Sequence, residues 1–134
     1  MPSVINLSEI PYFDGHCDTI WRCMYGEPAA CGGLRENNGH LDLLRSDRYG
    51  RRAQFFALFE NAATLPSGPV WPHLCAMHRW FQEQLAASGD MAVLCRTGGE
   101  VDAAVSSGRA AALLSIEGAD LLDCKAENLY TVSS

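Results

Sequence analysis

The fold class is decided by residues 91–116, which read MAVLCRTGGEVDAAVSSGRAAALLSI. Two short apolar runs in this stretch, Met91–Cys95 and Ala110–Ile116, are typical of buried strands. Between them, Thr97 is a good N-cap for a short helix over residues 99–107, which a glycine then ends. A strand, a helix and a second strand in this order predict one unit of a parallel β-sheet.

The rest of the chain continues this alternation. Residues 11–18 (PYFDGHCD) and 52–59 (RAQFFALF) are two further strand candidates. The second is apolar throughout, as expected of a strand buried on both faces. A helix is predicted from about Pro72 to Ala87, because apolar residues recur there at spacings of three and four. A loop-rich stretch is expected over residues 25–39, and a last helix over 126–132.

Four strands alternating with helices predict an α/β fold of the (β/α)8 TIM-barrel type. A closed barrel of eight strands takes roughly 200–250 residues, whereas this chain has 134. We therefore expect residues 1–134 to form one domain that corresponds to the N-terminal half of a barrel, with about the first four β/α units.

Composition excludes several classes of protein. Hydrophobic residues make up 48% of the chain and charged residues 19%, which favours a folded core over disorder. The net charge of −6 argues against a nucleic-acid partner, because phosphate binding needs a basic surface. No apolar run approaches the ~20 residues of a membrane span, and the N-terminus lacks the basic start of a signal peptide. We expect a cytoplasmic protein with no membrane partner.

The cysteines are expected to be reduced and structural, because thiols stay reduced in the cytoplasm. No two of them have the C-x-x-C spacing of a structural zinc site, so a zinc ribbon or zinc finger is not indicated. The six are Cys17, Cys23, Cys31, Cys75, Cys95 and Cys124.

Polar residues stand at the ends of two predicted strands, where barrel enzymes place their active sites. His16 and Asp18 are two positions apart, so their side chains share one face of an extended chain. An imidazole and a carboxylate together form a good half-site for a divalent metal such as zinc. Glu117 ends another strand, and its two oxygens could bridge a pair of metals. The structural alternatives are a hydrogen-bonded pair for His16 and Asp18, and a helix N-terminal carboxylate for Glu117.

Other histidines and arginines fit structural roles better. His40 and Asp42 repeat the His-x-Asp spacing, but they follow a Gly- and Asn-rich loop, which favours a loop or a helix start. His73 and His78 are five apart, which is a poor match to helical zinc ligands. His78 lies on the apolar stripe of its helix, so a packed core histidine is expected. Cys75 and His78 are three apart and could share a metal, but the sequence offers no further ligand near them. A cluster of basic residues is expected to form a solvated face: Arg45, Arg48, Arg51 and Arg52.

Three segments together resemble the membrane (renal) dipeptidase family of zinc peptidases, especially its bacterial members. They are DGHCDT at 14–19, GRRAQFFALF at 50–59 and LLSIEG at 113–118. The segments occur in the family's order and at suitable spacings. The resemblance implies a (β/α)8 barrel that holds two zinc ions and hydrolyses dipeptides. It also matches Gln54 to a family glutamine, for which we expect a structural hydrogen bond near the site.

The resemblance assigns a role to each candidate residue. His16 and Asp18 correspond to ligands of one zinc ion, and Glu117 corresponds to the catalytic carboxylate that bridges both ions. A metal-bound hydroxide would attack the peptide bond of a dipeptide. The sequence departs from the family at Cys17, where Asn is usual, and at Ala119, where Gly is frequent. The family's remaining histidine ligands lie on later strands, so we expect this stretch alone to be inactive without a C-terminal half.

Two other functions remain open. The chain could be a non-catalytic half-barrel that acts as an oligomeric or interaction module, because open strand edges favour self-association. It could also be another metal hydrolase of the amidohydrolase type, because a His-x-Asp pair on a first strand is shared widely among such barrels.

Overall fold

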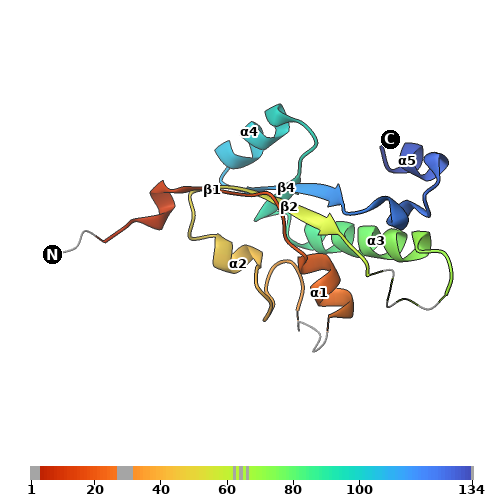
Figure 1. Ribbon diagram of the computed structural model, residues 1–134. Helices are drawn as coiled ribbons and strands as arrows, with labels where there is room; N and C mark the ends of the chain where they lie inside the picture. Colours follow the sequence, from red (N-terminus) through yellow and green to blue (C-terminus); the bar gives the residue numbers. More distant parts are fainter. Residues whose placement is uncertain (1–3, 27–31, 62, 64, 66, 134) are drawn as a thin grey trace.

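The computed structural model describes residues 4–26, 32–61, 63, 65 and 67–133, in which a four-stranded parallel sheet has helices on both faces (Figure 1). The strands are β1 (Pro11–Asp14), β2 (Arg51–Leu58), β3 (Ala92–Leu94) and β4 (Ala110–Ile116). The α-helices are α1 (Thr19–Tyr25), α2 (Leu43–Ser46), α3 (Trp71–Ala87), α4 (Gly98–Ser106) and α5 (Ala126–Ser133). Short 3-10 helices cover Leu7–Glu9 and Ala119–Leu122. The α/β class expected from the sequence is confirmed.

The order of the strands in the sheet is β1-β2-β4-β3. In a simple succession of barrel units β3 would lie between β2 and β4, but here it lies at the edge. It has three residues and pairs with only the first part of β4, from Ala92 opposite Ala110 to Leu94 opposite Ala112. The longer β2 pairs with β4 as far as Leu58 opposite Ile116. As a result, the carboxyl ends of β1, β2 and β4 lie side by side.

The first strand is shorter than the sequence suggested, since it ends at Asp14 and not at Asp18. The Asp14 side chain accepts a hydrogen bond from the His16 backbone N–H at 3.1 Å. Such a turn, closed by an aspartate over its own backbone, ends the extended chain. Helix α1 follows directly and was not among the expected elements, whereas α2 begins after Asp42, where a loop or a helix start was expected.

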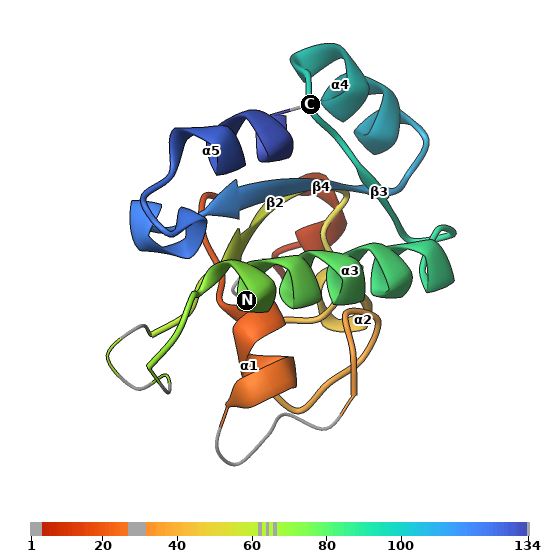
Figure 2. The same ribbon diagram turned by 90° about the vertical axis from the view of Figure 1, so that its right-hand side faces the viewer.

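Helix α3 lies on the same face of the sheet as α1 and α2 (Figures 1 and 2). Its apolar stripe supplies the centre of the larger core, as its spacing predicts. Phe81 is fully buried, and its ring lies 5.4 Å from that of Phe56 on β2. The buried residues of the stripe are Leu74, Met77, Phe81 and Leu85.

Helix α4 packs on the opposite face, over a second core of smaller side chains (Figure 1). The predicted cap is confirmed, because the Thr97 side chain accepts from the Glu100 N–H while Glu100 accepts from the Thr97 N–H. Hydrogen bonds from the Arg96 and Thr97 backbone N–H groups to the Glu100 carboxylate hold the pKa of Glu100 below its usual value. Gly108 has a φ of 81°, as expected of a glycine that follows a helix.

The basic cluster is not simply a solvated face, and the expectation is wrong for Arg52. This side chain is 4% exposed, forms an ion pair with Asp47 and donates to the Gly108 carbonyl at 3.0 Å. An arginine can be buried when its donors find such acceptors. Arg45 pairs with Asp42, whereas Arg48 and Arg51 are exposed.

The cysteines that the structure describes are free thiols, namely Cys17, Cys23, Cys75, Cys95 and Cys124. Cys31 lies outside the described residues. Burial raises the pKa of the Cys95 thiol, so it behaves as a small apolar side chain in the core below α4. Within the described part of the chain, none of the helices has the length and apolarity needed to cross a membrane.

Candidate metal centre

His16, Asp18 and Glu117 meet at the carboxyl edge of the sheet. The His16 Nε2 atom lies 3.2 Å from Asp18 Oδ1 and 3.5 Å from Glu117 Oε2. One potential ligand atom from each side chain lies within 4.8 Å of the other two. All three side chains are about half exposed, at 51%. Within the described residues, they form the one group of three or more side chains that could hold a metal ion.

Strand β2 positions both segments that carry these side chains. The Ala57 backbone N–H donates to the Cys17 carbonyl at 3.0 Å, which fixes the chain between His16 and Asp18. The carbonyl of the next residue, Leu58, accepts a hydrogen bond from the Glu117 N–H at 3.0 Å. Two consecutive residues of one buried strand therefore place the first segment beside the second.

Gly118 allows the chain to leave β4 directly after Glu117. Its φ of 94° belongs to a region that side chains other than glycine rarely adopt. A Cβ atom at this position would also lie 2.3 Å from Asp120 Oδ1. The backbone can thus turn sharply into the following 3-10 helix and leave the carboxylate at the sheet edge.

A polar network lies directly below His16 and fixes the turn that carries it. The Tyr12 hydroxyl lies 2.7 Å from Gln54 Oε1 and 3.1 Å from Asp14 Oδ2. Gln54 also donates to the Phe55 carbonyl, so the predicted structural hydrogen bond of this glutamine is confirmed. Burial, and then the charge of Asp14, raise the pKa of Tyr12 far above its usual value, which keeps the hydroxyl protonated as a donor.

The arrangement fits a zinc ion. Ligand atoms about 2.0–2.1 Å from a tetrahedral zinc lie about 3.3 Å from one another, close to the two separations measured from His16 Nε2. An imidazole nitrogen and two carboxylate oxygens are also ligands that zinc accepts. Because each side chain is half exposed, coordination positions remain for further ligands on the open side. The residues present can therefore hold part of a zinc site.

A pocket of about 800 Å³ adjoins His16 and Asp18. Its lining includes Trp21 and Phe59 and, from the loop, Asn37 and residues 39–41. Its volume lies within the range of small-molecule sites, about 300–1,000 Å³.

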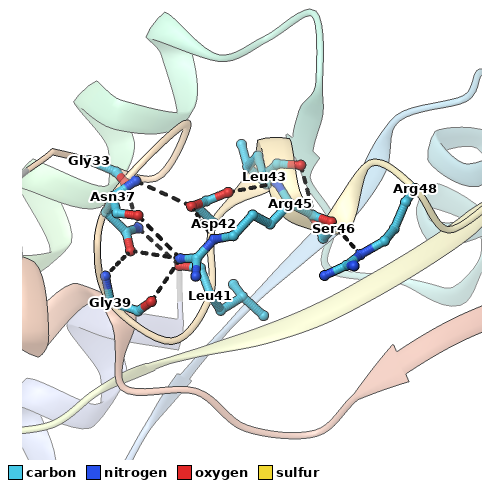
Figure 3. A network of polar contacts seen from close by, with 9 residues as sticks. All are labelled: Gly33, Asn37, Gly39, Leu41, Asp42, Leu43, Arg45, Ser46 and Arg48. Carbon is cyan, nitrogen blue, oxygen red and sulfur yellow. Dashed lines mark hydrogen bonds and ion pairs between the residues drawn. The ribbon is translucent and has the colours of Figure 1, made fainter.

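A buried carboxylate holds the loop beside this pocket (Figure 3). Asp42 is 1% exposed and caps α2 by accepting from the Arg45 N–H at 2.7 Å. It also accepts from Arg45 Nε at 2.6 Å and from the Asn37 N–H at 3.3 Å. Burial opposes ionisation, but these hydrogen bonds outweigh it and hold the pKa of Asp42 below its usual value. The second His-x-Asp pair is thus a helix start, one of the two structures expected for it.

The other histidines lie apart from the cluster. His40 lines the pocket from the loop, and its side chain is exposed. His73 and His78 are on α3; His78 is partly buried, less than its place on the apolar stripe suggested. His73 lies 3.5 Å from Glu60, measured from Nδ1 to Oε2. Sequence reasoning missed Glu60, although its place two residues after β2, at the same sheet edge, was a usable signal.

Comparisons with known proteins identify the family of the chain. The model of the family described as Membrane dipeptidase (Peptidase family M19) matches residues 5–134. No curated protein matches the chain.

Two solved structures resemble the chain. One is a metallo peptidase from Rhodobacter sphaeroides, liganded with a phosphinate mimic of the dipeptide L-Ala-D-Ala, with 22% sequence identity and a TM-score of 0.69. The other is the dipeptidase AC, a metallo peptidase, with 25% identity and a TM-score of 0.65. The matches cover 94% and 92% of this chain but 44% and 40% of those chains, so this chain spans less than half of their length.

The parallel sheet and its helices therefore correspond to part of a fold of the TIM-barrel type, as the resemblance implied. The family match extends from before β1 to the end of α5 and includes all three segments of the sequence resemblance. The chain belongs to the membrane dipeptidase family.

Proposed function

We propose that this chain supplies the first part of the active site of a zinc-dependent dipeptidase. In this proposal His16 and Asp18 bind one zinc ion, and Glu117 bridges it to a second. The observation that carries the proposal is the set of ligand-atom separations at the sheet edge, 3.2 Å and 3.5 Å from His16 Nε2. The bound dipeptide mimic in the Rhodobacter sphaeroides relative supports a dipeptide as the substrate class.

Each side chain has a separate task in the reaction. When bound, zinc lowers the pKa of a coordinated water and polarises a carbonyl group. His16 presents Nε2 toward the two carboxylates, and the Asp14 side chain fixes its backbone. Glu117 carries two oxygens, and one of them faces His16. The two carboxylates would offset half of the four positive charges of two zinc ions.

Three ligands cannot complete the shells of two zinc ions, since each ion takes about four. We therefore extend the proposal to residues 1–134 as the N-terminal half of a metal-dependent dipeptidase barrel. The missing ligands would come from a C-terminal half or from a second copy of the chain. A single copy of this chain would then have no peptidase activity.

Metal analysis of the purified chain tests the proposal. We expect about one zinc ion per chain, the number that the described cluster can hold, and its loss in His16→Ala. The matched control is His40→Ala, because His40 lines the same pocket but lies outside the cluster. Zinc that is absent from the wild-type chain, or lost equally in both variants, would refute the assignment.

The second candidate is an interaction module without catalysis. One observation favours it: Phe13 on β1 is 69% exposed, at the edge of the sheet and beside the Phe55 ring. An edge strand with an exposed aromatic residue can pair with another chain. Light scattering would then show a dimer that Phe13→Asp converts to a monomer, with zinc content unchanged.

A further inference from the structure

Glu60 is a buried carboxylate at the carboxyl end of β2. The residue is 6% exposed, and its Oε1 atom accepts hydrogen bonds from Trp21 Nε1 and from the Asn61 N–H, both at 3.0 Å. Its other oxygen faces His73 Nδ1 at 3.5 Å, and that buried nitrogen has no hydrogen-bond partner among the described residues. Burial of a carboxylate is costly unless hydrogen bonds compensate it, so the contacts of Glu60 indicate what it holds in place.

The group that Glu60 holds is the Trp21 indole of α1. The indole ring lies edge-on to Phe59, with 6.1 Å between the ring centroids. These two rings, here called the aromatic wall, line the pocket that also contains His16 and Asp18. A hydrogen bond from an indole N–H to a carboxylate is stronger than one to a neutral acceptor. Glu60 therefore restricts the rotation of the larger ring.

We infer that Glu60 is a positioning residue that fixes Trp21 in the pocket, and that the aromatic wall receives an apolar side chain of the dipeptide. The second part rests on the proposed function, because it takes a dipeptide as the ligand. Two aromatic rings offer a large apolar surface at fixed geometry next to the metal cluster. Neither ring carries an acceptor for a polar side chain, so the wall favours apolar residues.

The Trp21 indole N–H signal in ¹⁵N NMR spectra tests the first part, after its assignment by loss in Trp21→Phe. In Glu60→Ala we expect this signal to shift and its hydrogen exchange to become ~10-fold faster, since the acceptor is gone. Glu60→Gln is the matched control: its amide oxygen keeps an acceptor, so the signal moves less. If Glu60→Ala does not fold, the test is made with Glu60→Gln alone, in which we expect a smaller shift of the Trp21 indole signal. A wild-type signal in every folded variant would overturn the inference.

Titration of the zinc-loaded chain with L-Phe-Gly and with Gly-Gly tests the second part. We expect L-Phe-Gly to shift the Trp21 signal and Gly-Gly to leave it unchanged, while Glu60→Ala keeps its zinc and loses the response. Equal shifts with both dipeptides, or none with either, would overturn the role of the aromatic wall. Failure of the wild-type chain to bind zinc would instead refute the proposed function, while the indole signal would still decide the role of Glu60.

Discussion

Two regions of this molecule carry the same His-x-Asp pattern, and the structure uses them in opposite ways. Asp18 is half exposed, and its oxygen lies near the nitrogen of His16 and the carboxylate of Glu117. Asp42 is almost fully buried, and both its oxygens already accept hydrogen bonds. His40 is exposed and lies outside the group of three candidate ligands. The comparison shows that the exposure of the carboxylate distinguishes a candidate ligand from a helix cap when the spacing does not.

The largest expected difference between Asp18 and Asp42 is in their effect on zinc affinity when each is replaced. We expect Asp18→Ala to weaken zinc binding by about 100-fold or more, since even residues that only support a ligand contribute 10–100-fold. Isothermal titration with zinc measures the change. Asp42→Asn is the control, because an asparagine still caps a helix, and its zinc affinity should equal that of the wild type. A comparable loss in both variants would break the comparison.

Stability should respond in the reverse order. Asp42→Ala removes a helix cap and a charged hydrogen bond, so the free energy of unfolding should fall by about 2 kcal/mol. Asp18→Ala changes an exposed side chain and should alter it by less than about 0.5 kcal/mol. Urea unfolding of metal-free protein gives both values. A larger loss in Asp18→Ala than in Asp42→Ala would contradict the assigned roles.

Two glycines with positive φ, one beside the candidate site and one far from it, allow an effect on zinc binding to be distinguished from an effect on stability alone. Gly118→Ala and Gly108→Ala should each cost about 1 kcal/mol of stability, because both force a side chain into a strained backbone region. Only Gly118 adjoins Glu117, so only its variant should also weaken zinc binding. Urea unfolding and zinc titration of the two variants check this. Equal zinc affinities would show that the turn after β4 does not position the carboxylate.

The smallest expected effect is the contribution of Asp42 to the loss of stability at low pH. The pKa of Asp42 is lower in the folded chain than its ordinary value of 3.8, so its stabilising contribution is complete above that value. The contribution is lost as the pH falls through the lowered pKa. Wild-type protein should therefore lose more stability than Asp42→Asn between pH values of about 5 and 2, as urea unfolding at both values would show. A steeper loss in the variant would contradict the low pKa.

Local patterns were enough to predict the regular elements with long apolar runs. The predicted strand over residues 110–116 and the helix from Pro72 to Ala87 agree with β4 and α3 to within one residue. Helix α1 was not predicted. It has only seven residues, and the turn at Asp14 that precedes it was assigned to the first strand. The strand order was not predicted either, since it depends on pairing partners far apart in the chain.

The ligand residues of the candidate site were predictable, because they directly follow predicted strands. His16, Asp18 and Glu117 were found from their place after strands, and the structure brings them together. Burial of a charged side chain is a property of the assembled fold, so local patterns did not predict that Arg52 and Glu60 are buried, even though Glu60 follows a strand.

The two hydrogen bonds from β2 to the site segments have a consequence for folding. Ala57 is hydrogen-bonded to Cys17 and Leu58 to Glu117, and these two partners are about a hundred positions apart in the chain. No zinc site of this geometry can exist until β1, β2 and β4 have associated, because an unfolded chain does not hold such distant groups together. If zinc binds as proposed, its affinity measures the fraction of chains in which the sheet is complete, and the metal stabilises that state by mass action.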